Sequence, residues 1–240
     1  MGDKRHEQQL EKWAREGKQG SPPVHAATVI LLRDTDSGPE TLMLRRNSKI
    51  AFGGMWVFPG GRVDPADSEG LDASDDLGAA RRAAVREAQE EAGMELSDAA
   101  LLPFSHWTPP PITPRRFLTW FFVARAPTRE VTIDGGEIRE HAWLSVDEVM
   151  RRRHDRDIEL APPTFVSLTT LGAHGSVDEA LEAARVREPE RFQTRIHVTD
   201  TGPVAIWHGD AGYEHEDPNT AGARHRLVMG KERWDYLRHD

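Results

Sequence analysis

REAQEEAGM, at residues 86–94, closes a stretch from Gly54 to Met94 that organises the rest of the chain. A helix capped by Asp75 and running to Ala92 would end just before Gly93. A glycine at that position favours the left-handed backbone that terminates many helices. The pattern therefore predicts that this stretch ends a helix.

Three glutamates share one face of the predicted helix. They stand at i, i+3 and i+4, which brings their Cβ atoms to about 5–6 Å from one another; they are Glu87, Glu90 and Glu91. Like charges at this spacing repel, so the face is either well solvated or offset by a cation. The opposite face carries small or apolar side chains that suit close packing on a sheet: Leu77, Ala80, Ala84 and Ala88.

An apolar run broken by Pro and two Gly precedes the helix, at Val57–Gly61. This pattern predicts a strand that runs into a loop, where bare backbone comes close to another group. The carbonyl of Gly61 is then a candidate oxygen ligand. A Gly-Gly loop beside a carboxylate-lined helix predicts an all-oxygen site for a hard cation such as Mg²⁺, shared with substrate phosphates. The alternative is that the glutamates form only a solvated helix face.

The same residues resemble the Nudix box, in which Gly, Glu, Arg-Glu, Glu-Glu and Gly recur at fixed spacing. Gly61 matches the opening glycine, and the second half matches at Arg86, Glu87, Glu90, Glu91, Gly93 and Met94. The resemblance implies an α/β fold, an α/β/α sandwich around a mixed sheet, and hydrolysis of a diphosphate linkage. It also implies that Mg²⁺ or Mn²⁺ is held by Glu87, Glu90, Glu91 and the Gly61 carbonyl, while Arg86 orients a carboxylate.

The box is interrupted by an insertion, because Arg86 stands 25 positions after Gly61, about eleven more than in the usual box. We place the insertion around Ala66–Ser74, and Asp67 stands where the box has its first Glu. Such an insertion, followed by a helix like Ala84–Gly93, resembles the peroxisomal-type coenzyme A diphosphatases. This favours coenzyme A or its acyl esters as substrate. The alternatives are ADP-ribose, a dinucleotide or another nucleoside diphosphate compound, and a non-catalytic Nudix module that senses ligands.

Hydrolysis of a diphosphate needs a base that takes a proton from the water that attacks phosphorus. A further glutamate is expected in this role. Glu137 stands six residues ahead of Trp143, in a segment that resembles the end of a Nudix domain, and it is our first candidate. Glu140 is the rival candidate. The simpler interpretation of Glu137 is a solvated carboxylate at the end of a strand.

Four arginines are candidates for binding the substrate phosphates, because a guanidinium forks onto phosphate oxygens: Arg45, Arg46, Arg115 and Arg116. The first two end a strand, and the other two follow a Pro-rich loop; a surface pair is the alternative. Trp56 and Phe58 could stack on an adenine, although packing in the core is the stronger interpretation.

The composition excludes several kinds of site and argues against some classes of function. The chain of 240 residues has 30% charged residues, a net charge of −9 and no cysteine. This excludes disulfides and Cys-based zinc sites, and argues against broad nucleic-acid binding. No run is long and apolar enough to cross a membrane, and a reducing cytoplasm is the expected compartment. The oligomeric state stays open, with a homodimer as one option.

We expect three regions: a charged tail at residues 1–21, either frayed helix or disordered, a Nudix domain at 22–155, and an α+β extension at 156–240 packed on that domain. Strands are predicted at 26–32, 41–44, 99–107, 117–126 and 137–144. The extension should hold helices at about 160–171 and 176–186 and a hairpin at 195–198 and 204–208.

Overall fold

The computed structural model describes residues 6–47 and 53–239, and within them the chain forms two compact units. The larger unit comprises Val24–His106 and Leu118–Glu190. The smaller unit comprises the chain up to Pro23, the segment Trp107–Phe117 and the chain from Arg191 onward. The predicted boundaries near residues 21 and 155 follow the sequence alone and stay predictions.

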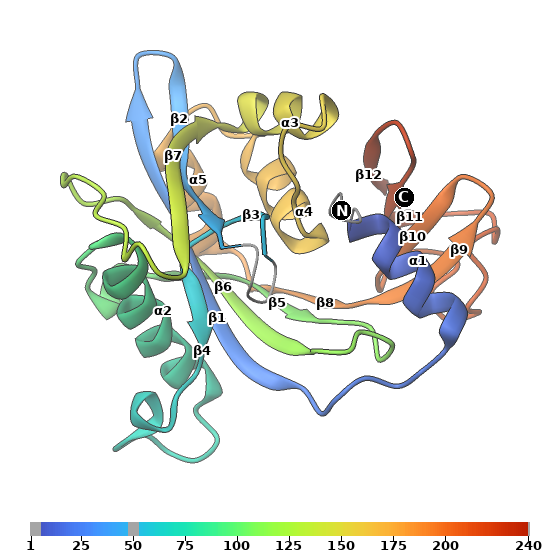
Figure 1. Ribbon diagram of the computed structural model, residues 1–240, viewed down its shortest axis with the longest axis horizontal. Helices are drawn as coiled ribbons and strands as arrows, with labels where there is room; N and C mark the ends of the chain where they lie inside the picture. Colours follow the sequence, from blue (N-terminus) through green and yellow to red (C-terminus); the bar gives the residue numbers. More distant parts are fainter. Residues whose placement is uncertain (1–5, 48–52, 240) are drawn as a thin grey trace. The chain divides into compact units, whose positions relative to one another are not determined.

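A mixed sheet forms the centre of the larger unit (Figure 1). Strands β3, β2, β1, β6 and β5 lie side by side in this order, with β4 beside β1 and β7 beside β2. Their bounds are β1 Val24–Thr35, β2 Gly38–Arg46, β3 Trp56–Val57, β4 Gly60–Arg62, β5 Leu102–Thr108, β6 Phe117–Arg125 and β7 Ile138–Ser145. Strand β8 is Glu190–Gln193. The five predicted strands are thus confirmed, with shifts of a few residues at their ends.

Strand β1 is buried on both faces. Val29, Ile30 and Leu31 are consecutive, so their side chains point alternately to the two sides, yet none is exposed. A strand with this pattern needs cover on each side of its sheet. Figure 1 shows α2 on one side of the strands and α3 and α4 on the other, as an α/β/α sandwich requires.

Helix α2, Asp76–Ala92, ends where the sequence predicts. The Asp75 side chain accepts a hydrogen bond from the Gly78 N–H, and Gly93 takes the left-handed conformation at φ 67°. The apolar face of α2 packs on β1, β2 and β6 through alanines, because small side chains let the helix lie close to the sheet: Ala80, Ala83, Ala84, Ala88 and Ala92.

The expected Gly-Gly loop is wrong in one respect. Gly60 and Gly61 belong to β4, which pairs antiparallel with β1 through Ala27 opposite Gly61. The close approach of the backbone is confirmed, since a Cβ atom on Gly60 would lie 2.4 Å from the carbonyl oxygen of Ala27. The pairing is with a strand about thirty residues earlier, which local sequence does not reveal.

Three helices complete the larger unit: α3 Val146–His154, α4 Pro162–Leu171 and α5 Val177–Val186. Ser145 and Ser176 cap α3 and α5 by accepting hydrogen bonds from the N–H groups of Glu148 and Glu179. The short 3₁₀ helices are η1 Pro65–Ser68 and η2 Asp98–Ala100. The helices predicted at about 160–171 and 176–186 are confirmed.

The smaller unit combines helix α1, His6–Glu16, with an antiparallel sheet in the order β12-β11-β10-β9. These strands are β9 Arg195–Thr199, β10 Gly202–Ile206, β11 Arg224–Met229 and β12 Trp234–His239. The predicted hairpin is therefore confirmed. The N-terminal segment is helical over residues 6–16, while residues 1–5 lie outside the described part. In the residues that the structure describes, no helix has the length and apolar character to span a membrane.

Candidate functional site

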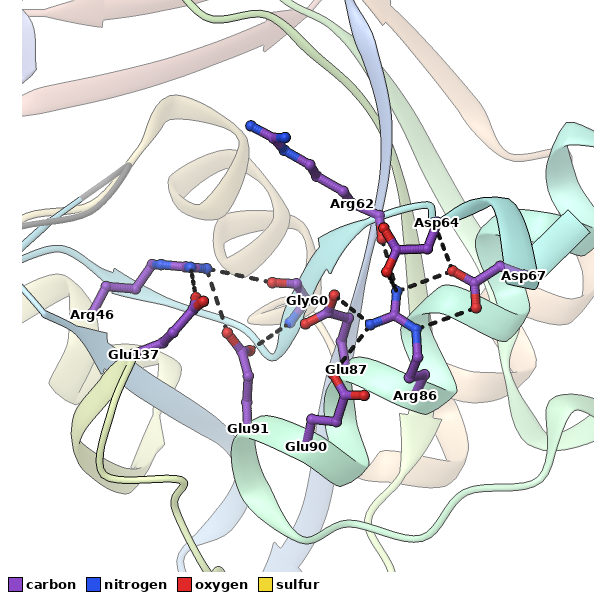
Figure 2. A network of polar contacts seen from close by, with 10 residues as sticks. All are labelled: Arg46, Gly60, Arg62, Asp64, Asp67, Arg86, Glu87, Glu90, Glu91 and Glu137. Atoms are coloured by element: carbon purple, nitrogen blue, oxygen red, sulfur yellow. Dashed lines mark hydrogen bonds and ion pairs between the residues drawn. The ribbon is translucent and has the colours of Figure 1, made fainter.

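The acidic face of α2 presents its three glutamates in three different environments. Glu91 is 4% exposed, Glu87 is partly buried, and Glu90 is exposed. Glu91 and Glu87 face strand β4, where the missing side chain of Gly61 leaves room for the Glu87 carboxylate and the Gly60 N–H donates to Glu91 (Figure 2). The acidic face is therefore not simply solvated, because the Glu91 carboxylate is shielded from water.

Glu91 is tied to the glycine strand and to β2. Its Oε2 accepts a hydrogen bond from the Gly60 N–H at 2.9 Å, and its Oε1 accepts one from Nη1 of Arg46 at 3.4 Å. Burial raises the pKa of Glu91 from its usual 4.5 to about 7, although the Gly60 N–H and Arg46 act in the opposite direction. Glu87 and Glu137 raise the pKa further, which means that both carboxylates are close enough to repel it.

Glu87 fills the space beside Gly61. A Cβ atom on Gly61 would lie 2.2 Å from Oε1 of Glu87, so any larger residue there would displace the carboxylate. Burial raises the pKa of Glu87, Arg86 lowers it, and Glu90 and Glu137 raise it again. This part of the site therefore contains a carboxylate that is partly desolvated and surrounded by negative charge.

Arg86 lies among several carboxylates. Its Nη1 donates to Glu87 at 2.8 Å and to Glu90 at 3.1 Å. Its Nε and Nη2 donate to the two carboxylate oxygens of Asp67 at 3.3 and 3.0 Å, and this hydrogen bond is the largest cause that raises the pKa of Arg86. The prediction that Arg86 orients a carboxylate fits these contacts. Asp67, whose role the sequence left open, contacts Arg86 despite the insertion.

Glu137 and Arg46 meet at the other end of the cluster. Nη2 of Arg46 donates to Oε2 of Glu137 at 2.6 Å, and Nη1 donates to the Gly60 carbonyl at 3.4 Å (Figure 2). The backbone of Glu137 is fixed, because its N–H donates to Asp134 and its carbonyl accepts from the Asn47 N–H at 2.7 Å. Arg46 thus bridges Glu137, Glu91 and the glycine strand.

Arg45, the other candidate for phosphate binding on β2, and Glu140, the other candidate for the base, form a separate pair. They lie opposite each other in the β2–β7 ladder and contact at 3.1 Å, with about half of each side chain exposed. The ladder shifts register between Arg45 and Arg46, and such a bulge redirects neighbouring side chains. Arg46 and Glu137 therefore share the cluster with Glu91, while Arg45 and Glu140 contact each other.

Two other predictions concern residues outside this cluster. Arg115 and Arg116 belong to the smaller unit, so their assignment to substrate phosphate stays a prediction. Trp56 and Phe58 are 4% and 2% exposed, and Phe58 packs edge-on against Phe121. Their burial supports the core interpretation over stacking on an adenine.

The donor set has the chemistry of a hard-cation site, since carboxylate and carbonyl oxygens are the ligands that Mg²⁺ prefers. In the part of the chain that the structure describes, no three His, Asp or Glu side chains are arranged to hold one metal ion. The glutamates pair instead with the guanidinium groups of Arg46 and Arg86. Burial and mutual repulsion raise the pKa of Glu87 and of Glu91, and a bound cation would relieve this cost.

A family model described as the NUDIX domain matches residues 23–164, more than half of the chain. The chain belongs to the NUDIX domain family. Membership makes it a hydrolase of diphosphate, or pyrophosphate, linkages and confirms the predicted fold class. Nudix enzymes generally use a divalent metal ion such as Mg²⁺.

Several solved structures resemble this Nudix chain. The NUDIX hydrolase from Alicyclobacillus acidocaldarius has a TM-score of 0.62 and 23% identity, over 68% of this chain and 96% of that one. A MutT NUDIX hydrolase from Burkholderia pseudomallei has 0.47 and 18%, over 62% and 98%. The Nudix domain of Shewanella oneidensis NrtR, complexed with ADP ribose, has 0.46 and 15%, over 62% and 86%. The first likeness shows the Nudix fold. No curated protein matches the chain.

Sequence reasoning missed how the arginines divide. It treated Arg45 and Arg46 as equivalent, whereas only Arg46 is paired with Glu91 and Glu137. Strand alternation was a usable signal, because adjacent residues point to opposite faces of a sheet. The choice between the two faces depended on the bulge opposite β7, which leaves no mark in the local sequence.

Proposed function

We propose that this Nudix hydrolase cleaves the diphosphate linkage of coenzyme A or an acyl-coenzyme A, in a reaction that needs Mg²⁺ or Mn²⁺. The observation that carries the site assignment is the gathering of Glu87, Glu91 and Glu137 around the Gly60–Gly61 strand. Burial is the largest cause that raises the pKa of Glu91 to about 7, and the charges of Glu87 and Glu137 raise it further. Such a cluster is suited to a divalent cation and a phosphorylated ligand.

Glu87, Glu90, Glu91 and the Gly61 carbonyl are the proposed cation ligands. When bound there, the cation would draw charge from the phosphoryl oxygens and lower the pKa of a coordinated water. Glu91 gains most from a bound cation, because burial raises its pKa to about 7, and the hydrogen bond from the Gly60 N–H holds its carboxylate in place. Glu90 is the most accessible of the three, and it forms an ion pair with Arg86.

Glu137 is the proposed general base. Its carboxylate lies near Glu87 and Glu91, is 60% exposed as a side chain, and is held at a fixed backbone position at the start of β7. A base at this place can take a proton from a water that attacks phosphorus. Glu140 is the weaker candidate, because its carboxylate pairs with Arg45, whereas Glu137 shares Arg46 with Glu91.

Arg46 is the proposed phosphate-binding residue of the larger unit. Its guanidinium already bridges two carboxylates of the site, so it can exchange these partners for phosphate oxygens when a substrate enters. We keep Arg115 and Arg116 as further candidates on the strength of the sequence resemblance.

The choice of coenzyme A rests on the interrupted Nudix box and its resemblance to the peroxisomal-type coenzyme A diphosphatases. The products would be 3′,5′-ADP and a phosphopantetheine compound. ADP-ribose and dinucleotides present the same diphosphate group to the same residues, so chemistry alone does not separate them from coenzyme A.

The test is product release with Mg²⁺, and with EDTA in its place, across coenzyme A, acetyl-coenzyme A, ADP-ribose, NADH and a nucleotide sugar. We expect Mg²⁺-dependent turnover with the highest kcat/KM for the coenzyme A compounds. A higher kcat/KM for another diphosphate would contradict the substrate and leave the site assignment standing. Turnover of none of them would favour a ligand-sensing Nudix module.

A further inference from the structure

A short exposed turn at residues 134–137 carries Glu137 into the site. Its sequence is Asp-Gly-Gly-Glu, and an isoleucine flanks it on each side. Ile138 is fully buried, and Ile133 packs against the same hydrophobic core. The turn between these two anchors is not covered by packing, so hydrogen bonds must hold Glu137 in place.

Asp134 closes the turn with both of its carboxylate oxygens. Oδ2 accepts a hydrogen bond from the Glu137 N–H at 2.9 Å, and Oδ1 accepts one from the Ile138 N–H at 3.0 Å. Gly135 has φ 70°, a left-handed conformation that turns the chain back toward Asp134. Hydrogen bonds to an ionised acceptor are stronger than those between neutral groups. Asp134 therefore holds the peptide groups on both sides of the Glu137 side chain.

Asn47 holds the same turn from the end of β2. Its N–H donates to the Glu137 carbonyl at 2.7 Å, and its Nδ2 donates to the Gly136 carbonyl at 3.2 Å. Asn47 directly follows Arg46, whose guanidinium contacts the Glu137 carboxylate. The backbone of Glu137 is thus bonded to one residue and its side chain to the residue before it.

The segment that leads into the turn is tied to the end of α2. The Thr132 N–H donates to the Ala92 carbonyl at 3.0 Å, and Ala92 directly follows Glu91. The turn is therefore attached to the sequence neighbours of two residues of the site, Glu91 and Arg46. Figure 2 shows the side chain of Glu137 directed toward both of them.

We propose that Asp134 and Asn47 form a clamp on the backbone of Glu137 that keeps this base in position while a substrate is bound. When Arg46 exchanges its carboxylate partners for phosphate oxygens, Glu137 loses its side-chain contact at 2.6 Å. The clamp remains, because its bonds do not involve the Arg46 side chain. This proposal rests on the proposed function, which makes Glu137 the base. Asp134 and Asn47 act through Glu137 and are positioning residues.

Asp134→Ala removes both acceptors of the clamp. A displacement of about 1 Å at a catalytic group can cost about 100-fold in rate, so we expect kcat to fall by about 10–100-fold. KM and the Mn²⁺ affinity measured by calorimetry should stay within about 2-fold of the parent, because the change acts on the base alone. Asp134→Asn keeps one acceptor oxygen and should recover part of kcat. Asn47→Ala loses the Nδ2 contact but keeps the backbone N–H, so its loss should be smaller.

The Glu137→Gln background shows whether Asp134 acts through the base. In that background Asp134→Ala should lower kcat further by less than about 2-fold, because residues that act as a unit are not additive. The same fold-loss in both backgrounds would overturn the proposal, as would full kcat or a lowered Mn²⁺ affinity in Asp134→Ala. Full kcat in Glu137→Gln would contradict the base assignment and the proposal together.

Asp72→Ala is the matched control. Asp72 is an exposed aspartate in the loop before α2, where it accepts hydrogen bonds from the N–H and the hydroxyl of Ser74, at the end of the helix opposite Glu91. It should leave kcat unchanged.

Amide hydrogen exchange provides a measurement that does not depend on turnover. The N–H groups of Glu137 and Ile138 should exchange faster in Asp134→Ala than in the parent, and at the parent rate in Asp72→Ala. Unchanged exchange in Asp134→Ala would overturn the clamp while the hydrolase assignment stands. An inactive parent enzyme whose Glu137 and Ile138 amides still exchange faster in Asp134→Ala would contradict the proposed function and keep the clamp.

Discussion

Each of the two units contains an arginine whose Nε and Nη2 donate to both carboxylate oxygens of an aspartate, and the two pairs differ in what surrounds them. In the smaller unit, Nε and Nη2 of Arg226 donate to Asp210 at 2.7 and 2.6 Å, and Nη1 donates to the Pro218 carbonyl. The remaining capacity of Asp210 is used by the N–H groups of His225 and Gly212. In the larger unit, the nitrogen of Arg86 that Asp67 leaves over reaches Glu87 and Glu90.

The difference is between a closed pair and an open network. The Asp210–Arg226 pair balances its charges and has side-chain exposures of 0% and 9%. Burial alone would raise the pKa of Asp210, but the hydrogen bonds from Arg226, His225 and Gly212 lower it to about 2. In the open network carboxylates outnumber arginines, and the pKa of Glu91 is raised to about 7. A structural pair satisfies its charge, whereas a binding site keeps negative charge for a ligand to neutralise.

Breaking the closed pair should produce the largest change in stability. Asp210→Asn leaves Arg226 buried without a carboxylate, and removing one partner of a buried ion pair costs about 3–5 kcal/mol. Denaturant unfolding at pH 7 measures this loss. Asp200→Asn, at an exposed aspartate in the turn between β9 and β10, is the control and should change the free energy of unfolding by less than about 0.5 kcal/mol. Equal stability of the two variants would contradict the closed-pair interpretation.

The stability contribution of Glu91 in the open network should fall as the pH rises. Because the folded-state pKa of Glu91 is above its unfolded value, its burial cost is absent below about pH 4.5 and complete above about pH 7. The rise corresponds to about 3 kcal/mol. Without divalent cations, Glu91→Gln should therefore gain stability relative to the parent by roughly 2–3 kcal/mol more at pH 8 than at pH 5. The same stability difference at both pH values would contradict a desolvated, charged Glu91.

The folded-state pKa of Asp210 lies below its usual value, so its stabilisation is present above about pH 4 and is lost as the pH falls toward about 2. The two carboxylates therefore mark the closed pair and the open network in separate pH windows.

Two adjacent arginines sharpen the comparison within the larger unit. Arg46→Ala removes a donor that bridges Glu91 and Glu137, and a hydrogen bond to a charged group contributes about 1.5–3 kcal/mol. We expect KM for the diphosphate substrate to rise by about 10-fold or more. Arg45→Ala should leave KM within about 2-fold, because Arg45 forms a solvent-exposed ion pair with Glu140. Steady-state kinetics of the two variants measures both KM values. Equal KM values would contradict the assignment of phosphate binding to Arg46 and not to Arg45.

The Arg45–Glu140 pair should have the smallest effect on stability. Its two side chains are 50% and 52% exposed, and exposed ion pairs contribute about 0–1 kcal/mol. A double-mutant cycle with Arg45→Ala and Glu140→Ala measures the coupling, and raising the salt concentration should reduce it further. A coupling above about 2 kcal/mol would mean that this pair belongs with the closed pairs.

Features encoded locally were predictable from the sequence. Helix α2 begins after Asp75 and ends before Gly93 as expected, because capping depends on neighbouring residues. The alanine face predicted its packing on the sheet. Gly60 and Gly61 were assigned to a loop, since their pairing with β1 is a contact between distant segments.

Features of the site that depend on three-dimensional pairing were not predictable. The separation of Arg46 from Arg45 follows from a bulge against β7. The contact between Asp67 and Arg86 depends on how the inserted segment folds back on α2. The sequence provided the residue types and their spacing, and the pairing of strands determined which of them meet.

The measurement that tests the central claim most directly is Mn²⁺ titration by calorimetry, with Mg²⁺-dependent hydrolysis measured in parallel, for the parent, Glu91→Gln and Glu95→Gln. Glu95 is an exposed glutamate just beyond α2 that contacts Arg129. We predict that Glu91→Gln stays folded, loses Mn²⁺ binding and lowers kcat by more than about 100-fold. Loss of a metal ligand should have a larger effect than the loss of about 10–100-fold seen when a residue that only orients a ligand is replaced. Glu95→Gln should match the parent in both. Unchanged Mn²⁺ binding and turnover in Glu91→Gln would contradict the assignment of the acidic face of α2 as the active site.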